Sequence, residues 1–226
     1  MMLTRRSILA AAALPLLPAR AAAQGWYDLT GDDGKPVQNQ RLPVELVADI
    51  ARLPGLIRTS AGTPDIAIVE FTDFNCPFCR RSAVDMPRLA AANRDVGIAY
   101  VNNPILSQGS REAALIELAV LKLLGPMTAA SFHQRMFSSP GKADRTKALA
   151  AARAIKLDPG AITEIAAPDP ELDAALAMQM QLAERLSLGA TPSFVVGTTG
   201  ILGYPGAKAM QRVIDNLRRC DEIVCG

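Results

Sequence analysis

The sequence predicts an α/β protein with a central mixed sheet and a large inserted helical subdomain. Residues 66–69 are an apolar, β-branched run typical of a buried strand, and a helical pattern follows at residues 80–92. A second buried strand is expected at residues 97–101. Strand character then disappears until residues 193–196, and the residues in between have helical patterns. The insertion therefore lies between the second and third strands of the sheet.

The inserted block spans about residues 105–188. Its first helix, at residues 111–124, is apolar nearly all round, which predicts that it is buried. Asp169 followed by Pro170 is a typical helix start, because aspartate caps free N–H groups and proline fits the first turn. Further helices are expected at residues 128–137, at residues 144–157 and, as a short one, after Asp158.

The chain returns to the sheet after this block. Residues 193–196 and 201–203, separated by a turn with glycines, predict a β-hairpin. The last helix opens at Gly206, and apolar residues at helical spacing give it one face that packs on the sheet: Met210, Val213, Ile214 and Leu217. Residues 220–226 form a tail.

Two segments precede the first strand. Residues 1–23 have the pattern of an export signal, with Arg5 and Arg6 before an apolar run and small residues at the cleavage site. The paired arginines resemble a twin-arginine signal, with the general secretory route as the alternative. The apolar run is too short to span a membrane, so no stable membrane insertion is expected. Residues 24–64 are expected to form a strap on the domain, with a partner-binding arm as the alternative.

The charge balance excludes one class of partner. Removal of the signal takes away three of the 24 basic residues and leaves 21 against 22 acidic ones. No basic excess remains that would indicate a nucleic-acid partner.

The cysteines point to redox chemistry. The segment Cys76-Pro77-Phe78-Cys79 lies where the first strand passes into a helix. A helix N-terminus offers free N–H groups and the positive end of the dipole, and both stabilise a thiolate. Cys76 is therefore the expected nucleophile, with a lowered pKa. Cys79, one turn into the helix, is the expected resolving thiol, and Pro77 suits the first turn.

These features together resemble the DsbA-like thiol:disulfide oxidoreductases of the bacterial envelope. The resemblance rests on the Cys-Pro-Phe-Cys motif after a strand, the helical block, Thr191-Pro192 directly before the hairpin, and the export signal. It covers about residues 65–219 and implies a thioredoxin-like fold with an inserted helical subdomain. It also implies a periplasmic or envelope location.

The resemblance assigns a role to each matching residue. Cys76 corresponds to the exposed nucleophile and Cys79 to its buried partner. Pro192 corresponds to the cis-proline beside the disulfide, which turns the backbone of Thr191 toward a substrate that pairs as an added strand. Glu70 corresponds to a buried acid that accepts a proton from Cys79. From the residues alone, a solvent-facing Glu70 is the alternative.

Phe78 is a departure from the best-known envelope oxidase, which has Pro-His between its cysteines. Histidine can donate to the thiolate or place charge near it, and phenylalanine cannot. We therefore expect a less acidic Cys76 and a less oxidising disulfide than in Pro-His enzymes. Substrate is expected to bind a shallow apolar surface formed by Pro77, Phe78, Thr191 and Pro192.

The second cysteine pair, Cys220 and Cys225, has several interpretations. An exported protein meets an oxidising compartment, so the pair is expected to form a structural disulfide that ties off the tail. A second redox relay is the alternative. A zinc site shared with Cys76 and Cys79 is a further one, because the spacing is allowed for structural zinc. His133, the only histidine, is expected at the surface.

The expected activity is thiol–disulfide exchange with unfolded or reduced exported proteins, in the direction of oxidation. The redox-active disulfide would serve without another cofactor or a bound metal. A membrane redox partner would reset the cysteine pair. One alternative is a disulfide isomerase or reductase, kept reduced and oligomerised by the N-terminal arm. An alternative of another class is an envelope protein that binds zinc or copper.

Overall fold

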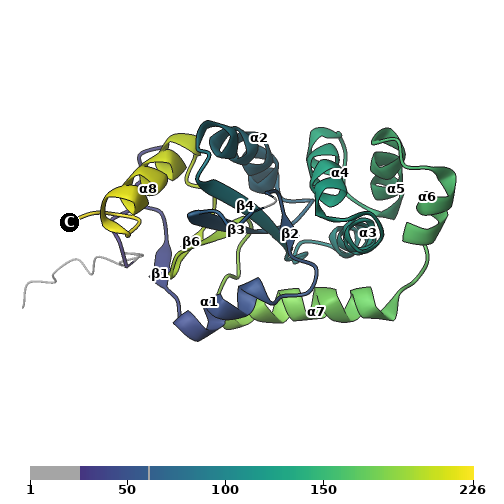
Figure 1. Cartoon of the computed structure of the whole chain (residues 1–226), viewed down its shortest axis with the longest axis horizontal. Helices are drawn as coiled ribbons and strands as arrows, with labels where there is room; N and C mark the ends of the chain where they lie inside the picture. Colours follow the sequence, from purple (N-terminus) through teal and green to yellow (C-terminus); the bar gives the residue numbers. More distant parts are fainter. Residues whose placement is uncertain (1–25, 61) are drawn as a thin grey trace, which may run out of the picture.

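The computed structural model describes residues 26–60 and 62–226 (Figure 1). The export signal predicted at residues 1–23 lies outside this range. The chain forms a six-stranded mixed sheet in the order β1-β6-β5-β3-β4-β2. The strands are β1 (Asn39–Arg41), β2 (Ile57–Arg58), β3 (Ile66–Thr72), β4 (Val96–Asn102), β5 (Ser193–Val196) and β6 (Thr199–Leu202).

The central strand β3 carries the chain into the site. It runs parallel to β4 and antiparallel to β5, so that Glu70 lies opposite both Tyr100 and Phe194. Side chains alternate between the faces of a strand. Ile68 accordingly belongs to the core on one face, and Val69 and Phe71 belong to the core on the other.

Helices cover both faces of the sheet and one end of it (Figure 1). Helices α2 (Pro77–Ala92) and α8 (Ala207–Cys220) cover one face, where Met86, Met210 and Val213 join the main core. Helices α1 (Val44–Ala51) and α7 (Pro170–Arg185) cover the other face. Both faces of the central strands are thus buried, which explains their nearly continuous apolar sequence.

The helical block comprises α3 (Gln108–Leu124), α4 (Pro126–Ser138), α5 (Arg145–Ala154), α6 (Pro159–Ile165) and α7. Side-chain oxygens cap four of these helices at their N-termini, those of Ser107, Asp144, Asp158 and Asp169. Asp169 and Pro170 occupy the cap and first positions that the sequence predicts. None of the helices in the described part of the chain has the length and apolar composition needed to cross a membrane.

Residues 26–58 lie against the domain. Strand β1 pairs with β6 and strand β2 pairs with β4, so they form the two edges of the sheet. The carboxylate of Asp32 accepts hydrogen bonds from the N–H groups of Lys208 and Ala209 at 3.0 and 2.8 Å. It thereby satisfies free donors at the start of α8, which has no side-chain cap of its own.

Two sequence predictions need correction. Strand β6 begins at Thr199, inside the predicted turn, because Val196 pairs with Thr199 and the turn is only two residues long. His133 is buried and not at the surface. Its Nδ1 lies 2.8 Å from the Glu117 carboxylate, and its ring stacks on Tyr100 at 3.9 Å between ring centres. These partners provide a buried setting that a helical pattern alone does not indicate.

Candidate active site

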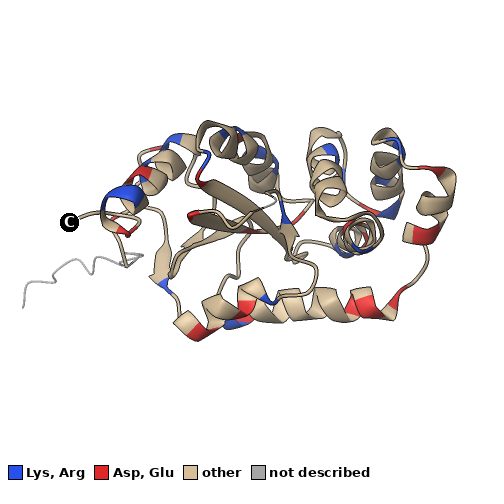
Figure 2. Cartoon of the chain, in the orientation of Figure 1, with Lys and Arg blue, Asp and Glu red and all other residues tan. Residues whose placement is uncertain are grey.

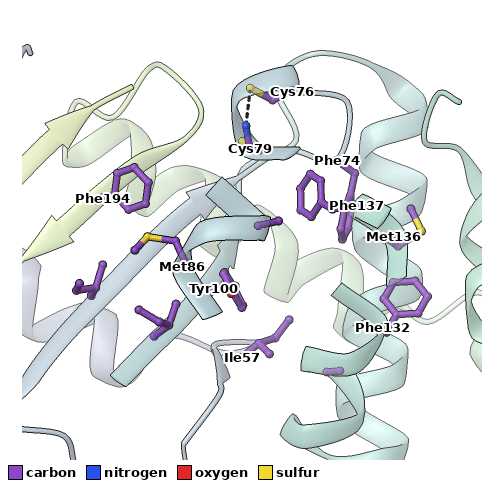
Figure 3. Packing of buried hydrophobic residues seen from close by; sticks show 14 of the residues in the cluster. Ile57, Phe74, Cys76, Cys79, Met86, Tyr100, Phe132, Met136, Phe137 and Phe194 are labelled. Atoms are coloured by element: carbon purple, nitrogen blue, oxygen red, sulfur yellow. Dashed lines mark hydrogen bonds between the residues drawn. The ribbon is translucent and has the colours of Figure 1, made fainter. Parts of the chain in front are cut away.

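Cys76 is the N-cap residue of α2. Its backbone is extended, and its Sγ accepts a hydrogen bond from the N–H of Cys79 at 3.5 Å (Figure 3). Pro77 holds the first helical position, where its missing N–H is not needed. The strand-to-helix junction therefore directs free donors at this sulfur atom, as the sequence predicts.

These donors lower the pKa of the Cys76 thiol to about 6. The group that lowers this pKa most is the Cys79 thiol, which donates a hydrogen bond to the Cys76 sulfur. The N–H of Cys79 and the side chain of Thr191 lower it further. Burial opposes them, because Cys76 is only 4% exposed. Above about pH 6, Cys76 is thus mainly the thiolate, which is the nucleophilic form.

Cys79 has the opposite character. It is fully buried, and burial together with the Cys76 sulfur and Glu70 strongly raises its pKa. Cys79 therefore remains a thiol at neutral pH unless a neighbouring group takes its proton. In this structure the two cysteines are present as the dithiol.

The loop before β5 brings Thr191 to the nucleophile. Because β5 pairs with β3 so that Ser193 lies opposite Phe71, the residues before Ser193 arrive at the end of β3, where the cysteine loop begins. In its protonated form, the Cys76 thiol donates to the carbonyl oxygen of Thr191 at 3.0 Å. The Thr191–Pro192 peptide bond is cis.

Glu70 lies under the cysteines on the face of β3 that α2 covers. It is 1% exposed, and its carboxyl accepts a hydrogen bond from the Ser82 hydroxyl of α2 at 2.8 Å. Burial raises the pKa of Glu70 to about 8. Glu70 is therefore mostly protonated at neutral pH, in an interior position and not in the solvent-facing one that the sequence left open.

Two polar residues that were not predicted as site residues fix the cysteine loop. Asp73 accepts hydrogen bonds from the N–H groups of Asn75 and Leu106 at 2.7 and 2.9 Å, and from the Ser110 hydroxyl at 2.6 Å. Asn75 binds the backbone of Ala143 through both ends of its amide. The sequence indicates their role only by their position between β3 and the cysteine motif, because polar residues there need hydrogen-bond partners from elsewhere in the fold.

A sequence profile of the family described as thioredoxin matches residues 62–216, which include the whole site. The chain belongs to the thioredoxin family. No curated protein matches it at a significant level.

Among solved structures, this thioredoxin-family chain is similar to a thioredoxin-like oxidoreductase from Silicibacter pomeroyi. The two are 34% identical with a TM-score of 0.66, and the match covers 74% of this chain and 94% of that one. The thiol-disulfide exchange protein α-DsbA2 from Wolbachia pipientis is 19% identical, with a TM-score of 0.68 and coverage of 76% and 94%. The catalytic domain of Proteus mirabilis ScsC is 20% identical, with a TM-score of 0.67 and coverage of 76% and 96%.

The family match and these likenesses confirm the predicted thioredoxin-like fold. The Silicibacter protein, which is 34% identical, is a thioredoxin-like oxidoreductase, and this agrees with the predicted class of enzyme. The two neighbours near 20% identity show the fold alone, whereas the Silicibacter protein is similar in sequence as well.

Phe78 forms an exposed apolar surface at this thioredoxin-family site. Its side chain is 48% exposed, and the Arg81 guanidinium lies over its ring at 4.6 Å. Beside it a groove of about 1210 Å³ runs between Thr191, Tyr204 and residues 31–38 of the N-terminal segment. The expected apolar surface thus continues from the cysteine motif into a groove.

The second cysteine pair is separate from this site. Cys220 and Cys225 are joined to each other in a disulfide. Within the described residues, no group of three or more His, Cys, Asp or Glu side chains is arranged to hold a metal ion.

Proposed function

We propose that this protein is an oxidase that transfers its Cys76–Cys79 disulfide to reduced proteins exported from the cytoplasm. The observation that carries the proposal is the contrast between the two sulfur atoms. The pKa of Cys76 is lowered to about 6, and that of Cys79 is strongly raised. Such a pair exchanges through Cys76 and returns to the dithiol with its thiolate stabilised, which makes the disulfide a good oxidant.

The first step is attack by a substrate thiolate on the Sγ of Cys76. A mixed disulfide forms, and the bond to Cys79 breaks with the electron pair on the Cys79 sulfur. Glu70, with its pKa of about 8, holds a proton at neutral pH and delivers it to this buried sulfur. In the reverse direction, ionised Glu70 accepts the proton when Cys79 attacks.

The second step releases the product. The second substrate thiolate attacks the substrate sulfur of the mixed disulfide, and Cys76 leaves as a thiolate. A thiolate with a low pKa is the better leaving group. Two substrate thiols are thereby oxidised to one disulfide, and the Cys76–Cys79 pair takes up the two electrons.

The substrate is an extended segment of an unfolded chain. Thr191 offers its backbone beside Cys76, where a strand can be added, and the exposed Phe78 ring and the adjoining groove accept apolar side chains. No cofactor besides the cysteine pair takes part in these steps.

The location follows from the predicted signal at residues 1–23. A structural neighbour from Salmonella enterica is described as a periplasmic thioredoxin-like protein, which supports an envelope location for this chain. A membrane oxidase in the same compartment would remove two electrons from the reduced pair and restore the disulfide.

The proposal is tested by mixing the oxidised protein with a reduced, unstructured peptide that contains two cysteines. Mass spectrometry should show one peptide disulfide for each Cys76–Cys79 pair reduced, and Cys76→Ser should abolish the transfer. An unchanged peptide would refute the proposal. A protein purified with bound zinc or copper and no transfer would favour the metal-binding alternative.

The direction of exchange is tested in cells. Rapid acid quenching and thiol labelling should find Cys76 and Cys79 mainly oxidised. A mainly reduced pair would overturn the oxidase proposal in favour of the isomerase or reductase.

A further inference from the structure

The Cys220–Cys225 disulfide lies at the far end of α2 from the nucleophile. Cys220 is the last residue of α8. Arg218, in the same last turn, forms an ion pair of 2.6 Å with Asp95, which lies just past the end of α2. Helix α2 has 16 residues, so roughly 24 Å separate its two ends. Direct exchange between the two pairs within one molecule is therefore excluded.

Contacts besides this disulfide hold the tail in position. Ile223 is 1% exposed and belongs to the main core. Its carbonyl oxygen accepts a hydrogen bond from the Asn216 amide at 2.9 Å, and the N–H of Asp221 bonds to Leu217 at 3.0 Å. The disulfide closes a separation of only five residues, so it restricts the unfolded chain little.

The two sulfur atoms of this disulfide differ. Cys220 is exposed at the C-terminus of α8, where the helix dipole disfavours a thiolate. Cys225 is half-buried, and the Nε of Arg219 donates to its sulfur at 3.3 Å. Arg219 is itself held by the Asn216 side chain at 2.7 Å. Figure 2 shows the basic last turn of α8 beside the C-terminus.

From this asymmetry we infer that Cys220–Cys225 is a second redox site, which exchanges with external thiols independently of Cys76 and Cys79. A thiolate attacks the Sγ of the exposed Cys220, and the sulfur–sulfur bond breaks with the electron pair on Cys225, where Arg219 stabilises the charge. A second thiol, from another glutathione molecule or from the same protein dithiol, then attacks the reductant's sulfur in the mixed disulfide, and the Cys220 thiolate leaves. The reductant leaves as a disulfide, and Cys220 and Cys225 remain as thiols. Glutathione or a protein dithiol has the required chemistry.

The test uses a Cys76→Ser/Cys79→Ser variant, which retains only the second pair, and reduced glutathione as the probe. We expect the folded protein to form a glutathione adduct on Cys220 and then the dithiol. Adding Arg219→Gln should slow the first step about threefold, because the leaving thiolate becomes more basic. Lys208→Gln removes an exposed positive charge at the other end of α8, so it is the matched control and should leave the rate unchanged.

Two further measurements do not depend on the double variant. Peptide mapping of the wild-type protein should place the adduct on Cys220, and a Cys220→Ser/Cys225→Ser variant should have the thermal unfolding midpoint of the wild type. A disulfide that glutathione cannot reduce in the folded protein, an adduct on Cys225, or a large fall in the midpoint would each overturn it. The last result would establish the purely structural role instead.

Discussion

The side-chain amide of Asn75 binds the backbone of Ala143 like a strand partner. Its Oδ1 accepts from the N–H of Ala143 at 2.7 Å, and its Nδ2 donates to the Ala143 carbonyl at 3.0 Å. Asn75 directly precedes the nucleophile, and Ala143 lies in the helical block. The inserted subdomain thus fixes the loop that sets Cys76 on the helix cap.

We predict that Asn75→Ala lowers the free energy of unfolding by about 1–3 kcal/mol, because buried backbone groups lose their partners. It should also raise the pKa of Cys76, since the loop no longer holds the sulfur at the cap. Urea unfolding and the pH dependence of Cys76 alkylation measure the two effects. Asn75→Asp keeps an acceptor for the Ala143 N–H and should be milder. An unchanged Cys76 pKa in Asn75→Ala would show that the hydrogen bonds between Asn75 and Ala143 do not position the nucleophile.

The alkylation rate of Cys76 should rise with pH and reach a plateau, with a midpoint near pH 6. The ionisation of Cys76 also makes the stability of the folded protein depend on pH. Because the pKa is lower in the folded than in the unfolded protein, the stabilisation of the dithiol form is complete above the unfolded pKa and disappears as pH falls through about 6. Thiolate absorbance near 240 nm follows the ionisation. A midpoint above pH 8 would contradict this account of the helix cap.

Phe78→His should lower the Cys76 pKa further and make the disulfide more oxidising. A histidine at this exposed position can donate to the thiolate or place positive charge beside it, and the phenyl ring cannot. Equilibration with glutathione redox buffers measures the potential, and Phe78→Leu serves as the apolar control. A potential that is equal in all three proteins would show that this position does not tune the pair.

Glu70→Gln separates the proton-transfer role from simple packing. Unfolded Glu70 ionises near pH 4.5 and folded Glu70 near pH 8, so its favourable contribution is full below pH 4.5 and is lost as pH rises to 8. Glutamine does not titrate, so the variant should gain stability relative to the wild type across this range. At about 1.36 kcal/mol for each pKa unit, the gain is a few kcal/mol.

The same variant should slow the attack of Cys79 on a mixed disulfide and remove the pH dependence of this step near pH 8. Stopped-flow measurement of mixed-disulfide decay follows it. If the decay kept the wild-type rate and pH profile, Glu70 would not be the proton acceptor.

The sequence predicts the parts of this fold whose patterns are local. Strands β3 and β4 are apolar runs, the caps of the helical block are marked by aspartate and proline, and the cysteine motif indicates its own chemistry. The edge strands β1 and β2 were not predicted, because they are three and two residues long and are defined by their partners.

Contacts between distant parts of the fold explain why the sequence did not predict the burial and roles of certain polar residues. His133 can be buried because Glu117 hydrogen-bonds to it and Tyr100 stacks on its ring. These two residues come from a different helix and from a strand. Asp73 and Asn75 look like ordinary loop residues until α3 and Ala143 are placed beside them. The burial of polar side chains depends on partners that one sequence without its fold does not specify.

The most direct test of the account is to trap substrates on Cys76. In cells expressing Cys79→Ser, the resolving thiol is absent, so mixed disulfides with exported proteins should accumulate and should disappear on treatment with dithiothreitol. Peptide mapping should place them on Cys76, and Cys76→Ser/Cys79→Ser is the control that should lack them. Absence of adducts on Cys76 would contradict the proposed exchange mechanism.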